Sequence, residues 1–586
     1  MKLSNSVSFI PTLSSYSAAS SFSLTDYTTF LRTFSSCSST RAASNVLSLA
    51  LLLLLLVMAM WVLVGLIMWH HPGGSAWGLY SLLLCWKTTG VTASNPRIAA
   101  IPGPRGFPFL GSLLDFVGRN GCCPHRRLAS LASYHGARSL MAFTLGYTRV
   151  VVSSHPSTAR RILCSPAFIE RPLTESARQL LFDRAIGFCP SGERWRSLRR
   201  LSSSHLFCPR RIAAHEPIRQ ADCAAMLDAM VEELAGTNCS VLQVRRYLQH
   251  AALNNIMAMV FGKWFAFTSV NGDGPNEAAE LQRMVREGFG LLGAFNITDH
   301  LNPLFESVDP LNIRQRCAAL VPKVFAYVNT IIEEHRDRHT SCRTSTSTSP
   351  SMTDASDFVD VLLARQGEEK FSDSDMVSIL WEMIFRGTDT MAILTEWIMA
   401  ELVLNQEMQE KLYKEIVETV GGGGNLRDVD AVRMPYLQAL VKEGLRVHMP
   451  GPLLSWARLA VHDTEVGGFL VPAGTTAMVN MWAITHDDNI WVDAERFQPE
   501  RFLTAAEQFE VRGGDMRLAP FGAGARACPG RALAMATVSM WVARIVQRFR
   551  VEEHPSYPVR LDEVLKLSCE METPLVARFV LRENAK

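Results

Sequence analysis

One cysteine near the C-terminus lies in a loop with an unusual composition, PFGAGARACPG. A cysteine thiolate binds a metal only if its negative charge is stabilised, and backbone N–H groups can do this where glycines allow a close approach. Gly522, Gly524 and Gly530 surround Cys528, and a helix that begins after Pro529 would direct its positive N-terminus at the sulfur. A lone thiolate suits haem iron better than zinc, because the porphyrin supplies four of the ligands.

The pattern F-x-x-G-x-R-x-C-x-G around this cysteine closely resembles the haem-binding signature of the cytochrome P450 family. Its specified letters are, in order, Phe521, Gly524, Arg526, Cys528 and Gly530. The resemblance extends from about residue 101 to the end of the chain. It implies the cytochrome P450 fold and haem b, whose iron the Cys528 thiolate would bind.

Two further motifs, EGLR and PERF, precede the cysteine loop in the order that the family has. E-x-x-R alone is a weak signal, because such pairs are common on solvated helix faces. The resemblance implies a buried ion-pair network of Glu443, Arg446 and Arg501 behind the haem. A bidentate carboxylate would satisfy the donors of a buried arginine, so we expect these residues to be structural.

The stretch FRGTDTMA interrupts a long apolar run with residues that cost helix stability. By resemblance, Gly387 opens a groove for dioxygen, and Asp389 and Thr390 relay protons to the bound oxygen. Arg386 departs from the family, which usually has Ala or Gly at this position. A run much like FRGTDT is typical of one land-plant subfamily of microsomal A-type enzymes, the KLUH-like group. A glycine that only allows two helices to pack closely is the alternative interpretation.

The motif WRSLR places Trp195 and Arg199 four residues apart, on one face of the predicted helix. By resemblance these two side chains bind a haem propionate, joined by Arg526 and by Arg458. Arginines that converge on two carboxylates are chemically reasonable in a buried pocket. Each arginine taken alone is more often a surface charge. Met383 and the segments 453–456 and 573–575 are candidate contacts for a substrate.

The first hundred residues differ from the rest in composition. Residues 1–45 are rich in Ser and Thr and contain Asp26 as their one acid, which predicts a disordered leader and also fits an organelle transit peptide. Residues 46–69 carry no charge and are long enough to cross a bilayer as a helix. We therefore expect a transmembrane anchor at 46–69, an interfacial linker at 70–100 and a haem-thiolate catalytic domain at 101–586.

Positive charge is denser after the anchor than before it, which predicts a catalytic domain in the cytosol. The expected location is the endoplasmic reticulum membrane, with a single pass, and a plastid is the alternative. The sequons at Asn238 and Asn296 are then expected to carry no glycan.

Apolar periodicity predicts helices at 221–236, 311–338, 373–405 and 406–421, and strands at 140–153 and 476–482. The expected fold class is mainly α with a minor β part, together with an N-terminal transmembrane helix. The net charge of +2 and the lack of a basic stripe argue against nucleic acid as a partner.

The resemblance implies a membrane-anchored haem-thiolate monooxygenase that hydroxylates a lipophilic small molecule, for which a fatty acid is one candidate. The sequence has no G-x-G-x-x-G after a strand pattern, so electrons from NADPH would arrive through a separate flavoprotein, NADPH–cytochrome P450 reductase. Membrane lipid is the other expected partner. Two alternatives stay open: a reductase-independent haem-thiolate isomerase or dehydratase, and a haem-binding sensor without turnover.

Overall fold

The computed structural model describes residues 40–88, 100–116, 123–237, 240–267, 277–301, 308–344, 357–365, 367, 370–455, 457–503 and 509–582. The chain divides into two units, Met1–Gly65 and Leu66–Lys586. Asn238, Trp456 and most of the Ser-rich leader lie outside the described residues. The division into leader, anchor, linker and catalytic domain stays a prediction.

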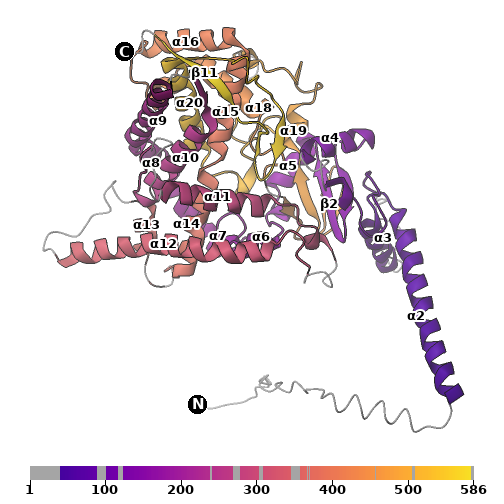
Figure 1. The fold of residues 1–586 in the computed structure, drawn as a ribbon. Helices are drawn as coiled ribbons and strands as arrows, with labels where there is room; N and C mark the ends of the chain where they lie inside the picture. Colours follow the sequence, from indigo (N-terminus) through magenta and orange to yellow (C-terminus); the bar gives the residue numbers. More distant parts are fainter. Residues whose placement is uncertain are drawn as a thin grey trace, which may run out of the picture. The chain divides into compact units, whose positions relative to one another are not determined.

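The described part of the first unit is helical. It belongs to α2 (Thr40–Trp69), the indigo helix in Figure 1, which continues past the boundary between the units. The stretch Asn45–Trp69 has a mean hydropathy of 3.0, and only 6% of its most apolar window is buried. A core helix of a soluble protein would bury such side chains. By length and composition this helix could therefore cross a membrane, and it begins at Thr40, earlier than the anchor predicted at 46–69.

The second unit is mainly helical, and its strands form small groups among the helices (Figure 1). The helices are α3 (Ser75–Thr88), α4 (Pro124–Tyr134), α5 (Pro156–Cys164), α6 (Glu175–Gln179), α7 (Glu193–His205), α8 (Pro209–Ala214), α9 (Glu216–Thr237), α10 (Val244–Phe261), α11 (Glu277–Gly293), α12 (Ile313–Thr344), α13 (Phe358–Leu363), α14 (Asp373–Gly387), α15 (Thr390–Leu404), α16 (Gln406–Val420), α17 (Asp428–Val432), α18 (Pro435–Val447), α19 (Met481–Thr485) and α20 (Arg531–Arg548). This confirms the predicted fold class.

The strands are β1 (Met141–Leu145), β2 (Thr148–Ser153), β3 (Val241–Gln243), β4 (Arg458–Leu459), β5 (Thr464–Val466), β6 (Phe469–Val471), β7 (Thr476–Val479), β8 (Phe549–Glu552), β9 (Glu563–Leu565), β10 (Cys569–Met571) and β11 (Val576–Leu581). Within the described residues they form four sheets, with the strand orders β1-β2-β7-β4, β3-β11-β8, β9-β10 and β5-β6. The β2–β7 pair is parallel.

Two predicted strand runs differ in detail from the structure. The run 140–153 is a hairpin, because Gly146, with φ +53°, turns the chain between β1 and β2. The run 476–482 ends as a strand at Val479, because the Asn480 side chain accepts a hydrogen bond from the Ala483 N–H and begins α19. Asparagine is a favourable helix cap, and this local bond competes with continued strand pairing.

The core of the second unit is built around α15, which is buried along almost its whole length between α10, α18 and α20. The predicted helical run 373–405 is two helices, α14 and α15, separated at Thr388 and Asp389. At the end of α14, a Cβ on Gly387 would lie 2.6 Å from Cγ1 of Ile256 on α10. The glycine thus allows α14 and α10 to approach closely at the point where the helix is interrupted.

Candidate active site

One cavity of the second unit brings together most of the residues that the sequence singles out. It lies between α7, the ends of α14 and α15, the segment 450–458 and the loop that precedes α20. The predicted site residues that line it are Trp195, Arg199, Gly387, Thr390, Arg458, Phe521, Arg526, Cys528 and Gly530. Gly524, Asp389 and the Glu443 network do not line it.

The cysteine loop is closed by a hydrogen bond of 2.9 Å from the Cys528 N–H to the Phe521 carbonyl. The Cys528 side chain is surrounded by protein yet exposed to the cavity. Burial raises the pKa of its thiol, and a hydrogen bond from the Gly530 backbone offsets part of this. The expectation that Gly522 would direct its N–H at the sulfur is wrong, because that N–H donates to the Ala519 carbonyl.

Gly524 shapes the loop from outside the cavity. Its φ is +69°, a left-handed conformation, and a Cβ on it would lie 2.4 Å from the Leu163 carbonyl oxygen at the end of α5. A side chain at this position would therefore be strained by its backbone and would also collide with α5. The glycine of the motif is required for packing against α5, which the sequence alone did not indicate.

The cavity is strongly cationic on one side. Burial and neighbouring arginines lower the pKa of Arg458 to about 10, and burial lowers that of Arg526 to about 10 as well. Sequence reasoning missed a further arginine, Arg171, which follows Glu170 in the stretch FIERP and also lines the cavity. Its Nε and Nη1 atoms are buried and have no hydrogen-bond partner among the described residues.

Buried donors without partners are costly unless an acceptor reaches them. The two propionates of haem would supply such acceptors to Arg171, Arg199 and Arg458. A cysteine that faces the same cavity would supply the iron ligand. The residues present therefore fit haem, judged by the chemistry of their donors.

Trp195 and Arg526 already have partners in the protein. The Trp195 indole N–H donates to the Ile186 carbonyl at 3.2 Å, and the Arg526 guanidinium lies 4.2 Å from the centre of the Trp195 ring. Arg526 also donates to the carbonyls of Ile169, Ile186 and Cys189 at 2.7–3.0 Å. These contacts fix the loop 185–190 beside the cavity, and the propionate roles of the two side chains stay predictions.

Glu443 and Arg446 of EGLR form a fully buried ion pair, and Arg501 of PERF is its third partner. Arg446 donates to both carboxylate oxygens of Glu443 at 2.8 Å, and both side chains have 0% exposure. Arg501 Nε lies 3.1 Å from Glu443 Oε1. The remaining Arg446 donors reach the carbonyls of Thr485, Ala494 and Arg496. The network ties α18 to the segment 485–501.

The interruption between α14 and α15 places Gly387 and Thr390 on the cavity wall, with Asp389 next to them. Burial and the nearby Glu570 raise the pKa of Asp389 to about 7. Glu570 in turn pairs with Arg245 and with the exposed Lys566. The Asp389 carboxyl group is thus influenced by a charged cluster that reaches the surface.

Arg386 is held in place from two sides. Its Nε donates to Oε1 of Glu382 at 2.9 Å, and the same oxygen accepts the Gly187 N–H at 2.8 Å. A Cβ on Gly187 would lie 2.1 Å from Arg386 Nη2 and 2.3 Å from Glu382 Oε1, so a side chain here would displace these groups from their present positions. Glu382 is 1% exposed, and its second oxygen has no partner in the described part of the chain.

Of the candidate substrate contacts, Met383, Leu454 and Ser455 line the cavity. The segment 573–575 does not line it: Leu575 is buried in the core, and its N–H donates to Glu396.

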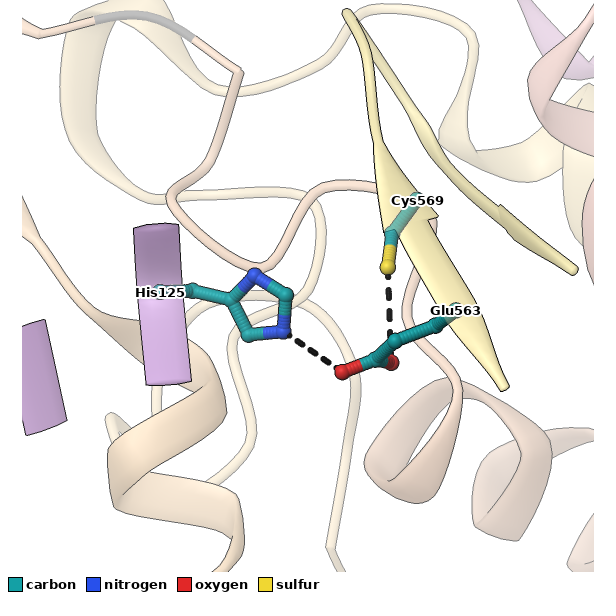
Figure 2. Close-up of side chains that lie close together, drawn as sticks. All are labelled: His125, Glu563 and Cys569. Atoms are coloured by element: carbon teal, nitrogen blue, oxygen red, sulfur yellow. Dashed lines mark hydrogen bonds and ion pairs between the residues drawn. The ribbon is translucent and has the colours of Figure 1, made fainter. Parts of the chain in front are cut away.

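A second polar cluster lies outside the cavity lining. Figure 2 shows His125 projecting from α4 toward Glu563, with Cys569 above that carboxylate in this view. His125 Nε2 lies 2.9 Å from Glu563 Oε1, and the Cys569 thiol donates to Oε2 at 3.4 Å. Arg126 pairs with the same carboxylate, and the pKa of Glu563 falls to about 2 under these contacts. His125 Nδ1 is buried and has no hydrogen-bond partner in the described part of the chain. Because His125, Arg126 and the Cys569 thiol all contact the Glu563 carboxylate, we interpret the cluster as a tether between α4 and the β9–β10 hairpin.

The comparisons with known proteins agree with this site. The family model described as Cytochrome P450 matches residues 101–571, and the chain therefore belongs to the cytochrome P450 family. Cytochrome P450 78A11 of Oryza sativa subsp. japonica is 53% identical, over 88% of this chain and 89% of that protein. Cytochrome P450 78A7 of Arabidopsis thaliana is 50% identical, over 88% and 91%. Flavonoid 3'-monooxygenase of Petunia hybrida is 29% identical, over 85% and 95%.

The chain is thus a plant-type cytochrome P450 monooxygenase that resembles the 78A group. Membership of the family implies haem with a cysteine thiolate ligand. Cytochromes P450 generally work with a redox partner and on lipophilic substrates.

Proposed function

We propose that this protein is a membrane-anchored monooxygenase that hydroxylates a lipophilic small molecule, with a fatty acid as a candidate. One observation carries the proposal. Cys528, the donor set for haem and the Gly387–Thr390 interruption all face one cavity, whose other walls are largely apolar. Ligand pockets have this character, with few polar groups in an apolar lining.

Each residue has a role in this proposal. Cys528 holds the haem iron, and the bound haem supplies the chemistry of oxygen activation. Phe521, Gly524 and Gly530 shape the loop around the sulfur. We assign propionate binding to four arginines of the cavity and to the adjacent tryptophan: Arg171, Arg199, Arg458, Arg526 and Trp195. The Glu443–Arg446–Arg501 network keeps α18 and the segment 485–501 in place.

Gly387 opens the groove for dioxygen at the cavity wall, where it also allows α14 to pack closely against Ile256 of α10. Thr390 on the wall and the adjacent Asp389 provide protons. A carboxyl group with a pKa of about 7 can both give and take a proton near neutral pH. Its position beside Thr390 favours turnover over the two alternatives, a sensor without turnover and a reductase-independent isomerase or dehydratase.

Electrons are proposed to come from NADPH through NADPH–cytochrome P450 reductase. The location proposed is the endoplasmic reticulum membrane, reached through α2 with the second unit in the cytosol, and a plastid is the alternative. Imaging of the tagged full-length chain distinguishes the two compartments.

The absorption difference spectrum of the reduced protein with carbon monoxide tests the haem assignment. The full chain should give the band of thiolate-ligated haem, and Cys528→Ala should abolish it. Cys208→Ala removes a thiol outside the cavity lining. It serves as the matched control and should leave the band intact. An unchanged band in Cys528→Ala would refute the assignment, and oxygenated product that forms only with NADPH and reductase separates an enzyme from a sensor.

A further inference from the structure

Two histidines and two carboxylates converge where α12 packs against the start of α13. His335 and His339 belong to α12, and Asp357 and Asp360 lie at the beginning of α13; we refer to these four residues as the α12–α13 cluster. The ligand atoms of His335, Asp357 and Asp360 all lie within 4.8 Å of one another. His339 Nε2 lies 2.9 Å from Asp360 Oδ1. The cluster is separate from the lining of the candidate active site.

The spacing of the two histidines suits a shared metal ion. Residues at i and i+4 project from the same face of a helix, and two zinc-binding histidines have this spacing in the motif H-E-x-x-H. In α12 the sequence reads HRDRH, so the acid of that motif is missing. The carboxylates come instead from α13, which faces the same side of α12.

The backbone of α13 fixes one oxygen of each carboxylate and leaves the other for a ligand. Asp357 Oδ1 accepts the Asp360 N–H at 3.1 Å, and Asp360 Oδ2 accepts the Asp357 N–H at 3.3 Å. This reciprocal pair is a capping box. Asp357 Oδ2 and Asp360 Oδ1 remain to face the two histidines. The carboxylates are therefore oriented before any ion binds.

The hydrogen bonds of His335 require a cation between its ring and Asp357. His335 Nδ1 lies 2.7 Å from the Ile331 carbonyl oxygen, which can only accept, so Nδ1 carries the proton of a neutral imidazole. Nε2 then presents a lone pair to Asp357 Oδ2, 2.8 Å away. Two acceptors at this distance repel each other unless a second proton or a metal ion lies between them. Metal-binding histidines usually donate their other ring N–H to a carbonyl or a carboxylate, as His335 does.

A divalent ion balances the whole cluster, whereas each proton balances one half of it. Burial lowers the pKa of His335, but its hydrogen bond to Asp357 outweighs this and raises the pKa, so an imidazolium is the alternative cation. Without a metal, two protons would form two separate pairs, His335–Asp357 and His339–Asp360. One divalent ion replaces both protons and joins all four groups. Arg338 lies 4.0 Å from Asp357 Oδ2, but its side chain is 60% exposed and can turn toward water.

The donor set selects the ion. Two imidazole nitrogens favour zinc over magnesium or calcium, which prefer oxygen ligands. With Zn–N and Zn–O bonds of about 2.0–2.2 Å, neighbouring ligands of a tetrahedral zinc ion lie about 3.3 Å apart. The present separations of 2.8 and 2.9 Å would need to widen by about 0.5 Å, which small side-chain rotations provide.

The cluster in Figure 2 also combines metal-binding residue types, but it is less suited to zinc. His125 Nδ1 is buried without a partner in the described part of the chain. If His125 bound zinc through Nε2, that Nδ1 would have to carry a proton with no acceptor. Arg126 also pairs with the Glu563 carboxylate. The α12–α13 cluster has neither disadvantage at His335.

We propose that the α12–α13 cluster binds one zinc ion through its two imidazoles and two carboxylates. Four protein ligands are typical of a structural zinc site. The ion joins chain positions 339 and 357, and its binding stabilises the folded chain because the unfolded chain lacks a preformed site. This role is independent of haem and of the proposed monooxygenase function.

Zinc binding is measured on the haem-loaded full chain, purified in detergent with a tag that contains no histidine and stripped of metal by a chelator. Competition with a chromogenic zinc indicator gives the stoichiometry and the affinity. The wild-type chain should bind one zinc ion, and zinc should raise its Tm. X-ray absorption at the zinc edge should show nitrogen and oxygen ligands at about 2.0–2.2 Å and no sulfur at about 2.3 Å.

Three variants sharpen the test. His335→Asn keeps an N–H for the Ile331 carbonyl but removes Nε2, so it should abolish the site. His339→Ala changes a side chain that is 52% exposed, so the chain should still fold. It should weaken zinc binding about 100-fold or more, because loss of a group that only orients a metal ligand already costs about 10–100-fold. His462→Ala removes an exposed histidine outside the cluster and should bind zinc as the wild-type chain does.

The proposal is overturned if the stripped wild-type chain binds no zinc, which would leave His335 as an imidazolium paired with Asp357. It is also overturned if His339→Ala binds zinc as tightly as His462→Ala, and this comparison decides the question if His335→Asn does not fold. Sulfur among the zinc ligands would assign the metal to the cluster in Figure 2 instead. A missing thiolate band with carbon monoxide would contradict the proposed function and leave the zinc measurement unaffected.

Discussion

The Asp389 side chain is next in sequence to Thr390, which lines the cavity, and it is buried near the charges of Glu570, Arg245 and Lys566. Burial disfavours the charged form of a carboxyl group, and a neighbouring carboxylate does the same. The pKa near 7 is therefore a consequence of position rather than of residue type.

The pH dependence of turnover should report this group. With a pKa of about 7, Asp389 is protonated below pH 7 and ionised above it, so a proton-donating role predicts that product formation falls as pH rises through 7. Asp389→Asn should be slow at all pH values and should lack this inflection. The measurement is the rate of product formation between pH 6 and pH 8.5, with reductase in excess.

Glu570→Gln serves as the control for that experiment. The Glu570 charge helps to raise the pKa of Asp389, and its removal should shift the inflection to lower pH. An inflection that stays in place in Asp389→Asn would show that another group controls the profile.

At the residue scale, the motif around Cys528 could be recognised from the sequence because its residues are contiguous. Arg171 could not, since its importance depends on Arg458, Arg386 and Arg526, which lie more than 200 positions away. Likewise, the sequence showed that Arg386 is unusual, but only the structure shows that Glu382 and Gly187 hold it.

The Glu443 network ties α18 to the segment 485–501 through a buried ion pair. Glu443→Gln would leave the buried Arg446 guanidinium without its counter-charge, and breaking a buried pair in this way costs about 3–5 kcal/mol. We expect a corresponding fall in the free energy of unfolding, measured by denaturant titration. The carbon monoxide band of the variant should disappear at a lower denaturant concentration than that of the wild-type protein. Lys411→Gln breaks the exposed Lys411–Glu500 pair and should cost about 0–1 kcal/mol. Equal effects of the two substitutions would contradict the structural role.

The tether between α4 and the β9–β10 hairpin should weaken in acid. The pKa of Glu563 is about 2 in the folded protein and about 4.3 in an unfolded chain. Its stabilisation is therefore complete above pH 4.3 and is lost as pH falls toward 2. Thermal unfolding between pH 6 and pH 3 should show a steeper decline for the wild-type protein than for Glu563→Gln. Glu510→Gln, at an exposed pair with Arg512, should follow the wild-type curve.

At the scale of elements, apolar periodicity located most long helices but not their interruptions. Within the run 373–405, the residues Arg386 to Thr390 interrupt the apolar pattern and have low helix propensity, but neither signal shows whether the helix ends there. Whether such residues bend, break or continue a helix depends on the neighbour, here Ile256 of α10. That contact joins residues 131 positions apart, which local patterns do not encode.

At the scale of the whole molecule, α2 should decide where the protein resides. Its apolar stretch predicts that the full chain stays with membranes during alkaline extraction. Leu53→Arg/Leu56→Arg places two charges near the middle of that stretch, at a cost of about 2.5–3.5 kcal/mol each. This variant should move into the soluble fraction, whereas Leu53→Ala/Leu56→Ala should not. Retention of the arginine variant in the pellet would show that other surfaces are sufficient for membrane binding.

The sequon at Asn296 offers an independent check of orientation. Asn296 is 5% exposed, and its Oδ1 accepts hydrogen bonds from Thr298. A glycan is therefore not expected there, and glycosidase treatment should leave electrophoretic mobility unchanged. A shift would contradict both this packing and a cytosolic second unit.

The order of the chain has a consequence for how the protein is made. Cys528, to which we assign the haem iron, follows the apolar helix by 459 positions, and the cavity wall draws on segments from Leu163 to Ser568. At about 5–20 residues per second, the ribosome needs roughly 20–90 s to reach Cys528 after it has completed α2. The nascent chain can thus be delivered to a membrane long before it can hold its cofactor.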